Sequence, residues 1–132
     1  LPTPNFMPER KFSGQKFVHS EVLDADWAQS RLPGFMSRDT TICKNTQGVA
    51  SVHLIKRGDG IPLWTSHTSD IHFNFVLEGG FTLEGVGQPA QELKSGDAFV
   101  IPPKMKVRYA HPSDDLELLE VSLPGDFKTQ VD

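Results

Sequence analysis

The chain has 132 residues, a formal net charge of −4 at neutral pH, and 37% hydrophobic and 23% charged residues. This length predicts a single domain over residues 1–132, and the composition excludes a disordered or repetitive protein. The longest apolar run, Ala98–Ile101, is far shorter than the ~20 residues of a membrane-spanning helix. The basic residues are scattered, so we expect neither a membrane nor nucleic acid as a partner.

The N-terminal segment, residues 1–14, contains several prolines and little periodicity, which predicts an extended arm. The sequence shows neither an initiator Met nor the apolar core of a signal peptide, so we expect a cytoplasmic protein. After the arm, Ser20 or Asp24 could cap a short helical turn that runs towards Trp27 and ends at Pro33.

The remainder of the chain has the pattern of an all-β domain. Ten prolines and eleven glycines separate short runs that are rich in β-branched and aromatic residues. Because many short strands must cover their edges, we expect a closed barrel or a two-sheet sandwich. Cys43, whose neighbours look like a strand, is the single cysteine and is interpreted as a small hydrophobic residue. The expected strands are Gln15–His19, Phe35–Ile42, Val49–Lys56, His72–Leu77, Phe81–Glu84, Gln88–Leu93, Ala98–Ile101, Lys106–His111 and Leu116–Ser122.

His67 and His72 are the pair of residues that most suggests chemistry. Being five residues apart, they would point to opposite faces of one regular strand. A shared metal therefore requires a break between them, and the turn-forming residues Thr68, Ser69 and Asp70 can supply it. The alternative is that His67 is solvated in a polar loop and that His72 is buried and hydrogen-bonded.

Strand alternation extends this site to other segments. His72, Asn74 and Val76 share one face that could line a cavity, while the opposite face, with Phe73 and Phe75, is apolar enough to pack on a second sheet. In a later strand, Val107, Tyr109 and His111 alternate onto a common face, which makes His111 a third candidate ligand. The alternative is that His111 is simply exposed at the end of a strand. Imidazoles suit Fe, Ni, Cu or Zn, whereas His53 is better explained as a supporting or core residue.

Two motifs resemble those of the cupin superfamily: residues 75–79 (FVLEG) and residues 95–103 (SGDAFVIPP). The resemblance runs from about Ser51 to Phe127, and residues 113–127 are similar to a branch of small bacterial cupins that includes 2,4'-dihydroxyacetophenone dioxygenase-like proteins. It implies an all-β cupin jelly-roll barrel over residues 49–127, commonly dimeric, with a site inside the barrel and often a divalent metal such as Fe, Ni, Mn or Zn.

The resemblance also implies that the usual metal site is altered. The family's His-x-His falls on residues 65–67, its later acidic or Gln position falls on His72, and the histidine of the second motif falls on Val107. Thr65 and Val107 thus stand at two ligand positions. His67 and His72 remain, and His111 could compensate where the barrel narrows.

Three functions are compatible with these residues. The first is a metal-dependent, oxygenase-type enzyme that acts on a small aromatic or carbonyl compound. The second is a barrel without metal that binds or senses a small organic ligand, and the third is metal-free acid–base chemistry by His72. A homodimer is expected from the N-terminal arm and because members of the resembled family are commonly dimeric. In the enzyme hypothesis the metal ligands are His67, His72 and His111, the groups that orient substrate are Asn74 and Tyr109, and the apolar walls are Trp64 and Phe81.

Overall fold

The computed structural model describes residues 14–22 and 27–132. The expected arm lies outside these residues apart from Gly14, and so does Asp24. In the described part of the chain there is one helix, α1 (Ile42–Asn45), and no helix that is long and apolar enough to cross a membrane.

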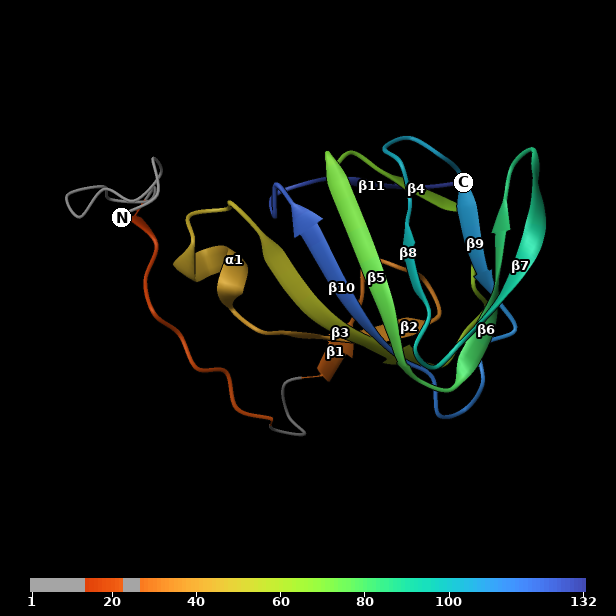
Figure 1. The fold of residues 1–132 in the computed structure, drawn as a ribbon, viewed down its shortest axis with the longest axis horizontal. Helices are drawn as coiled ribbons and strands as arrows, with labels where there is room; N and C mark the ends of the chain where they lie inside the picture. Colours follow the sequence, from red (N-terminus) through yellow and green to blue (C-terminus); the bar gives the residue numbers. More distant parts are fainter. Residues whose placement is uncertain (1–13, 23–26) are drawn as a thin grey trace, which may run out of the picture.

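Two antiparallel sheets make up almost all of the regular structure, which confirms the all-β prediction. Figure 1 shows β5 and β10 at the centre of one sheet and β6, β7 and β9 on the opposite side of the molecule. The six-stranded sheet has the order β1 (Trp27–Gln29), β2 (Phe35–Asp39), β3 (Ser51–Arg57), β10 (Glu117–Leu123), β5 (Ile71–Glu78) and β8 (Ala98–Val100). The five-stranded sheet has the order β11 (Thr129–Val131), β4 (Thr65–His67), β9 (Val107–Ala110), β6 (Gly80–Gly85) and β7 (Gln88–Lys94).

Most of the expected strands are present, with boundaries shifted by one or two residues. The run Gln15–His19 forms no strand, and Trp27 begins β1, which was not expected. Residues 23–26 of the expected helical turn lie outside the described residues. The expected strand through Ile42 ends at Asp39, because Thr41 adopts a left-handed φ of 66° and its N–H donates to the Asp39 carboxylate. Residues 42–45, which include Cys43, therefore form α1 and not a strand.

The side chains between the sheets divide into an apolar half and a polar half. Phe81 stacks on Tyr109 with ring centroids 5.2 Å apart, and Phe35 meets the Tyr109 ring edge-on at 5.8 Å. The buried apolar residues that complete this half are Leu32, Ile55, Val76, Ile101, Val107, Leu116 and Leu118. The polar half contains buried side chains from β4, β5 and β10, and it holds the candidate site.

The alternation in β5 corrects one expectation. His72, Asn74 and Val76 are fully buried and face inwards as predicted, but Phe73 and Phe75 are partly exposed on the outside of the sheet. The apolar face of this strand is thus the outer one. The polar face can lie inside because a network of hydrogen bonds satisfies His72, as described next.

Candidate functional site

An ion pair between the partly buried Arg31 and the fully buried Glu120 forms the centre of the polar half. Arg31 Nε donates to Glu120 Oε1 and Arg31 Nη2 donates to Oε2, each at 3.1 Å. This is the two-pronged geometry in which an arginine and a carboxylate match best. Arg31 Nη1 also donates to Thr129 Oγ1 at 3.2 Å, and the guanidinium lies 5.3 Å from the centre of the Phe127 ring.

Arg31 reaches the interior from the tight loop between β1 and β2. Ser30 Oγ accepts the Leu32 N–H at 2.7 Å, and the Phe35 N–H donates to the Leu32 carbonyl at 3.1 Å. Leu32 is buried in the apolar half. The loop is therefore anchored on both sides of Arg31 without using the arginine side chain.

His72 is fully buried and both of its ring nitrogens are occupied. Arg31 Nη2 lies 2.8 Å from His72 Nε2, and an arginine can only donate, so Nε2 is the acceptor. Nδ1 then carries the proton and donates to Ser122 Oγ at 2.8 Å. Burial, followed by the Arg31 charge, lowers the pKa of His72 to about 3 against the opposing effect of Glu120. His72 is therefore neutral at physiological pH, which does not suit the proton-transfer role considered for it.

His67 lies beside His72, with ring centroids 4.4 Å apart. The predicted break makes this possible, because β4 ends at His67 and β5 begins at Ile71. The ring is held by the backbone: Nδ1 accepts the Ser69 N–H at 3.1 Å, so Nε2 is the donor to the Ile101 carbonyl at 2.7 Å. Burial also lowers the pKa of His67.

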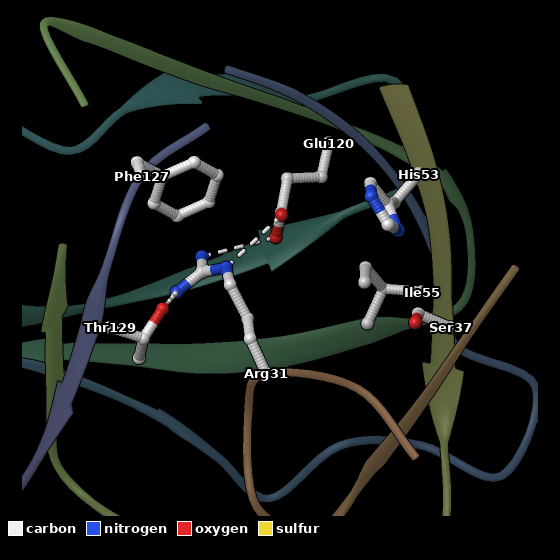
Figure 2. A pocket seen from close by; sticks show the side chains of 7 residues that line it. All are labelled: Arg31, Ser37, His53, Ile55, Glu120, Phe127 and Thr129. Carbon is white, nitrogen blue, oxygen red and sulfur yellow. Dashed lines mark hydrogen bonds and ion pairs between the residues drawn. The ribbon is translucent and has the colours of Figure 1, made fainter. Parts of the chain in front are cut away.

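The ion pair forms one wall of a pocket of about 420 Å³. Figure 2 shows the Arg31 side chain rising towards Glu120, with Phe127 on one side and His53 on the other. His53 pairs in register with Glu120 across β3 and β10, and its Nε2 lies 4.0 Å from Asp39 Oδ1. The full lining consists of Arg31, Ser37, His53, Ile55, Glu120, Phe127 and Thr129.

Arg31 and Glu120 each keep the other ionised in this pocket. Burial opposes ionisation of Glu120, but the neighbouring basic groups, Arg31 above all and then His72, together outweigh it, so the pKa of Glu120 lies below its ordinary value. Burial likewise opposes the charge on Arg31, and Glu120 together with Tyr109 more than compensates, so the pKa of Arg31 is raised. The pocket therefore contains one full positive and one full negative charge in direct contact.

Asn74 and Tyr109, both predicted to orient substrate, lie inside the barrel behind the ion pair. The Tyr109 hydroxyl is close enough to Arg31 and Asn74 for both to influence its pKa, which burial raises. Neither that hydroxyl nor the Asn74 amide makes a hydrogen bond of regular geometry. Buried polar groups without partners are costly and often mark functional interiors.

The other predicted site residues lie elsewhere. His111 is exposed and lines a separate depression with Phe81, because β9 ends at Ala110 and His111 adopts a left-handed φ of 51° that interrupts the alternation. Trp64 lies outside the pocket lining, with the Arg108 guanidinium 5.4 Å from its ring centre. Phe81 belongs to the apolar half. The structure thus brings His67 and His72 together and leaves His111 apart from them.

Sequence reasoning missed both members of the ion pair. Glu120 is 2% exposed and was not among the candidate site residues. Its alternation with Leu118 and Ser122, which are also buried, was the available signal. Arg31 lies 89 residues before Glu120, and no local pattern marks it.

The residues present do not fit a bound divalent ion. His67 has both nitrogens engaged by backbone groups, and the Nε2 of His72 accepts from a cation. Thr65 and Val107, which the resemblance aligns with two ligand positions, are buried and paired in register. Among residues 14–22 and 27–132, no group of three or more His, Cys, Asp or Glu is arranged to hold a metal ion. A metal at His72 would have to displace the Arg31 guanidinium.

The sequence profile of the cupin domain matches residues 51–122, which is more than half of the chain. The chain belongs to the cupin family. A comparison with curated proteins gives no match. The matched segment contains His67, His72 and Glu120, whereas Arg31, Phe127 and Thr129 lie outside it.

Solved structures share this fold at low sequence identity. Pac13, a nucleoside dehydratase from Streptomyces, has a TM-score of 0.63 at 12% identity over 86% of this chain and 92% of its own. A cupin-like protein from Thermotoga maritima has a TM-score of 0.61 at 20% identity, with 88% of each chain covered. A variant of salicylate 1,2-dioxygenase from Pseudoaminobacter salicylatoxidans, in complex with gentisate, has a TM-score of 0.61 at 15% identity over 75% of this chain and 29% of its own. At these identities the likeness shows the fold alone.

Proposed function

We propose that this cupin binds a small, neutral organic molecule that carries hydroxyl groups, in the pocket walled by Arg31 and Glu120 and without a metal ion. The observation that carries the proposal is the two-pronged ion pair, with Glu120 fully buried and Arg31 partly buried, that lines the pocket. A volume of about 420 Å³ is within the range of small-molecule sites.

The charge of the pocket favours a neutral ligand. An anion near Arg31 would also approach the Glu120 carboxylate, and a cation near Glu120 would approach the guanidinium. In a partly buried site such like-charge contacts are costly. A neutral polar molecule meets neither penalty.

The hydrogen-bonding capacity of the pocket favours hydroxyl groups on the ligand. The four hydrogen bonds of Arg31 use four of the five guanidinium N–H donors. The Glu120 oxygens each accept one bond from Arg31 and retain further acceptor capacity. Ser37 and His53 add groups that both donate and accept, and Phe127 provides an apolar surface for a ring.

This proposal differs from the metal-dependent oxygenase that the sequence suggested first. That function needs ligand nitrogens that are free to bind an ion, and those of His67 and His72 are engaged. It corresponds instead to the second expectation, a small-ligand barrel without metal. The structural neighbours include a nucleoside dehydratase and a salicylate dioxygenase. A neutral nucleoside and an anionic aromatic acid are therefore suitable probes to distinguish the two hypotheses.

Ligand-observed NMR on the purified protein tests the proposal with uridine, which is neutral and hydroxyl-bearing, and with salicylate, which is an anionic aromatic compound. We expect saturation transfer to uridine and none to salicylate. Glu120→Gln should abolish the uridine signal because it removes the carboxylate. Arg57→Gln, a change in an exposed ion pair with Asp114, is the control and should retain it.

Two results would overturn the proposal. One is an absence of binding by uridine and by ribose at millimolar concentration, and the other is uridine binding that Glu120→Gln leaves unchanged. Consumption of O₂ with gentisate on addition of Fe²⁺, lost in His72→Gln, would support the oxygenase instead.

A second candidate is acid–base catalysis on the bound ligand by His53. This is favoured by its position: His53 lines the pocket directly across from Glu120 in the β3–β10 register, and imidazole is the most common catalytic acid or base. Exchange of a carbon-bound hydrogen of uridine for deuterium in D₂O would reveal such proton transfer. His53→Gln should stop the exchange while uridine still binds, and exchange at the wild-type rate in that variant would exclude His53.

A further inference from the structure

We infer that Arg31 is the resident cation of this barrel: its guanidinium occupies the position in which a divalent ion would contact His72 and Glu120, and removal of its charge opens a metal site there. The inference concerns a cation site and is separate from the identity of the ligand in the pocket.

Acceptor atoms of three residues surround the guanidinium. The two Glu120 oxygens lie at 3.1 Å, His72 Nε2 lies at 2.8 Å and Thr129 Oγ1 lies at 3.2 Å from its nitrogens. A carboxylate with an imidazole is a donor set that first-row divalent metals accept. His72 Nε2 and Glu120 Oε2 are 3.8 Å apart, so one ion with bonds of about 2.1 Å can contact both.

Both candidate ligands already have the protonation state that a metal requires. Metal-bound imidazole uses an unprotonated nitrogen, and its other N–H commonly donates to an orienting partner. His72 has this arrangement, with Nε2 directed at Arg31 and Nδ1 donating to Ser122 Oγ. Glu120 faces the Arg31 charge as a carboxylate in the ion pair, and a divalent ion in place of that charge would keep it ionised.

The guanidinium can be removed without removing the anchors of its loop. The hydrogen bonds that fix the loop are made by Ser30, Leu32 and Phe35, and Leu32 provides the apolar contact. A substitution at Arg31 therefore takes away a positive charge and leaves its four acceptor atoms around a smaller or uncharged side chain.

The experiment compares Arg31→Met, which is long and uncharged, with Arg31→Lys, which retains a charge. Each protein is titrated with Co²⁺ up to millimolar concentration and followed by visible absorption and thermal melting. We expect Arg31→Met to gain d–d absorption bands, one Co²⁺ per chain and a higher melting temperature with Co²⁺. The wild-type protein and Arg31→Lys should gain none of these.

Two further variants assign the ion to this position. The double variant Arg31→Met/His72→Ala should lose the bands, which excludes binding by surface histidines. Arg57→Met is the matched control, because it removes a different ion-paired arginine, at the surface, and should behave as the wild type.

The inference is overturned if folded Arg31→Met binds no Co²⁺, or if the wild-type protein binds Co²⁺ through His72. Where Arg31→Met is unfolded alone, Co²⁺ should restore its melting transition, and failure to restore it also overturns the inference. None of these readouts depends on uridine, so failure of the proposed function is seen separately.

Discussion

At the scale of single residues, the pair of Arg31 and Glu120 controls the chemistry of the barrel interior. Removing two charges from water costs several kcal/mol for each, and their attraction compensates only with good geometry and further hydrogen bonds. Both conditions hold here, since Arg31 also donates to His72 and Thr129. The pair is therefore interdependent: each charge is tolerated inside because the other is present.

This interdependence predicts the outcome of a double-mutant cycle. Glu120→Ala should reduce the free energy of unfolding by about 3 kcal/mol, because it leaves Arg31 unpaired in the interior. The double variant Arg31→Met/Glu120→Leu should cost less than that single change, because no charge remains buried. Urea denaturation measures both, and a double variant that is less stable than Glu120→Ala would contradict the interpretation.

The buried histidines predict that acid destabilises the fold. An unfolded histidine has a pKa of about 6.5, whereas that of folded His72 is about 3. Between these values the unfolded chain binds the proton and the folded chain does not, so stability falls as the pH falls, by up to about 1.4 kcal/mol per pH unit from His72. The lowered pKa values of His67 and Glu120 act in the same direction.

Urea denaturation across the range from pH 7 to pH 5 tests this prediction. His72→Gln should make the decline in unfolding free energy shallower. His111→Gln, at an exposed position, is the control and should keep the wild-type slope. A slope that His72→Gln leaves unchanged would show that other groups cause the acid sensitivity.

At the scale of elements, breaks and corners between strands place the site residues. The break after β4 brings the rings of His67 and His72 together, and the corner between β5 and β6 carries the chain from one sheet to the other. At this corner Gly79 has a φ of 71°, and an added Cβ would lie 2.8 Å from the Leu116 backbone nitrogen and against the Ser113 hydroxyl. The corner therefore requires glycine for both conformation and space.

A comparison of Gly79 with Gly87, which has a similar φ, separates the effect of backbone conformation from the effect of limited space. Gly87 has a φ of 76° with open space where a Cβ would stand, whereas Gly79 is enclosed. Both Ala variants should lose about 1 kcal/mol of stability to the left-handed conformation, and Gly79→Ala should lose about 1–3 kcal/mol more to overpacking. Thermal denaturation compares them, and equal losses would mean that the corner relaxes freely.

Local signals account for what the sequence predicted of these elements. Glycine and proline mark the corners, and period-two alternation marks strands of four residues or more, so β3, β5 and β10 were found with small boundary errors. Three of the four three-residue strands in the described residues, β1, β4 and β11, were missed because they are too short to show alternation, whereas β8 was found from its continuous apolar run. They pair through backbone contacts with other strands, which a local pattern does not contain.

The site was predictable only where its parts are close in sequence. The break between His67 and His72 lies within six residues and was recognised from its turn-forming side chains. The prediction for His111 assumed that β9 continues, but the left-handed backbone at that residue ends the alternation. Arg31, Phe127 and Thr129 join the pocket through tertiary folding, so their role could not be read from local spacing.

At the scale of the whole molecule, the outer face of the six-stranded sheet has an apolar patch over β5, β8 and β10. Phe73 faces outwards between Val121 and Val100, which are its partners in register, and Phe75 lies beside Leu119 in the next row. Val100 is 60% exposed, and Ile71 and Leu77 are also exposed. Exposed apolar surface of this kind often marks a contact between proteins.

We propose that this face pairs with a second copy of the chain. An apolar surface is complementary to itself under twofold symmetry, and β8 places exposed Val100 at its margin. Val100→Glu should shift the protein from dimer to monomer in size-exclusion chromatography with light scattering. The control is Val86→Glu, at a turn with 62% exposure, and a monomeric wild-type protein would contradict the proposal.

The pocket is lined partly by residues outside the cupin segment, and this has an evolutionary consequence. Its cation is provided by a loop that precedes the cupin segment, and its aromatic wall is provided by residues that follow that segment. Selection can therefore alter these flanking pieces while the central ladder of β3, β10 and β5 remains intact. Related barrels with the same core should accordingly differ in what they recognise according to the lengths and side chains of these two flanks.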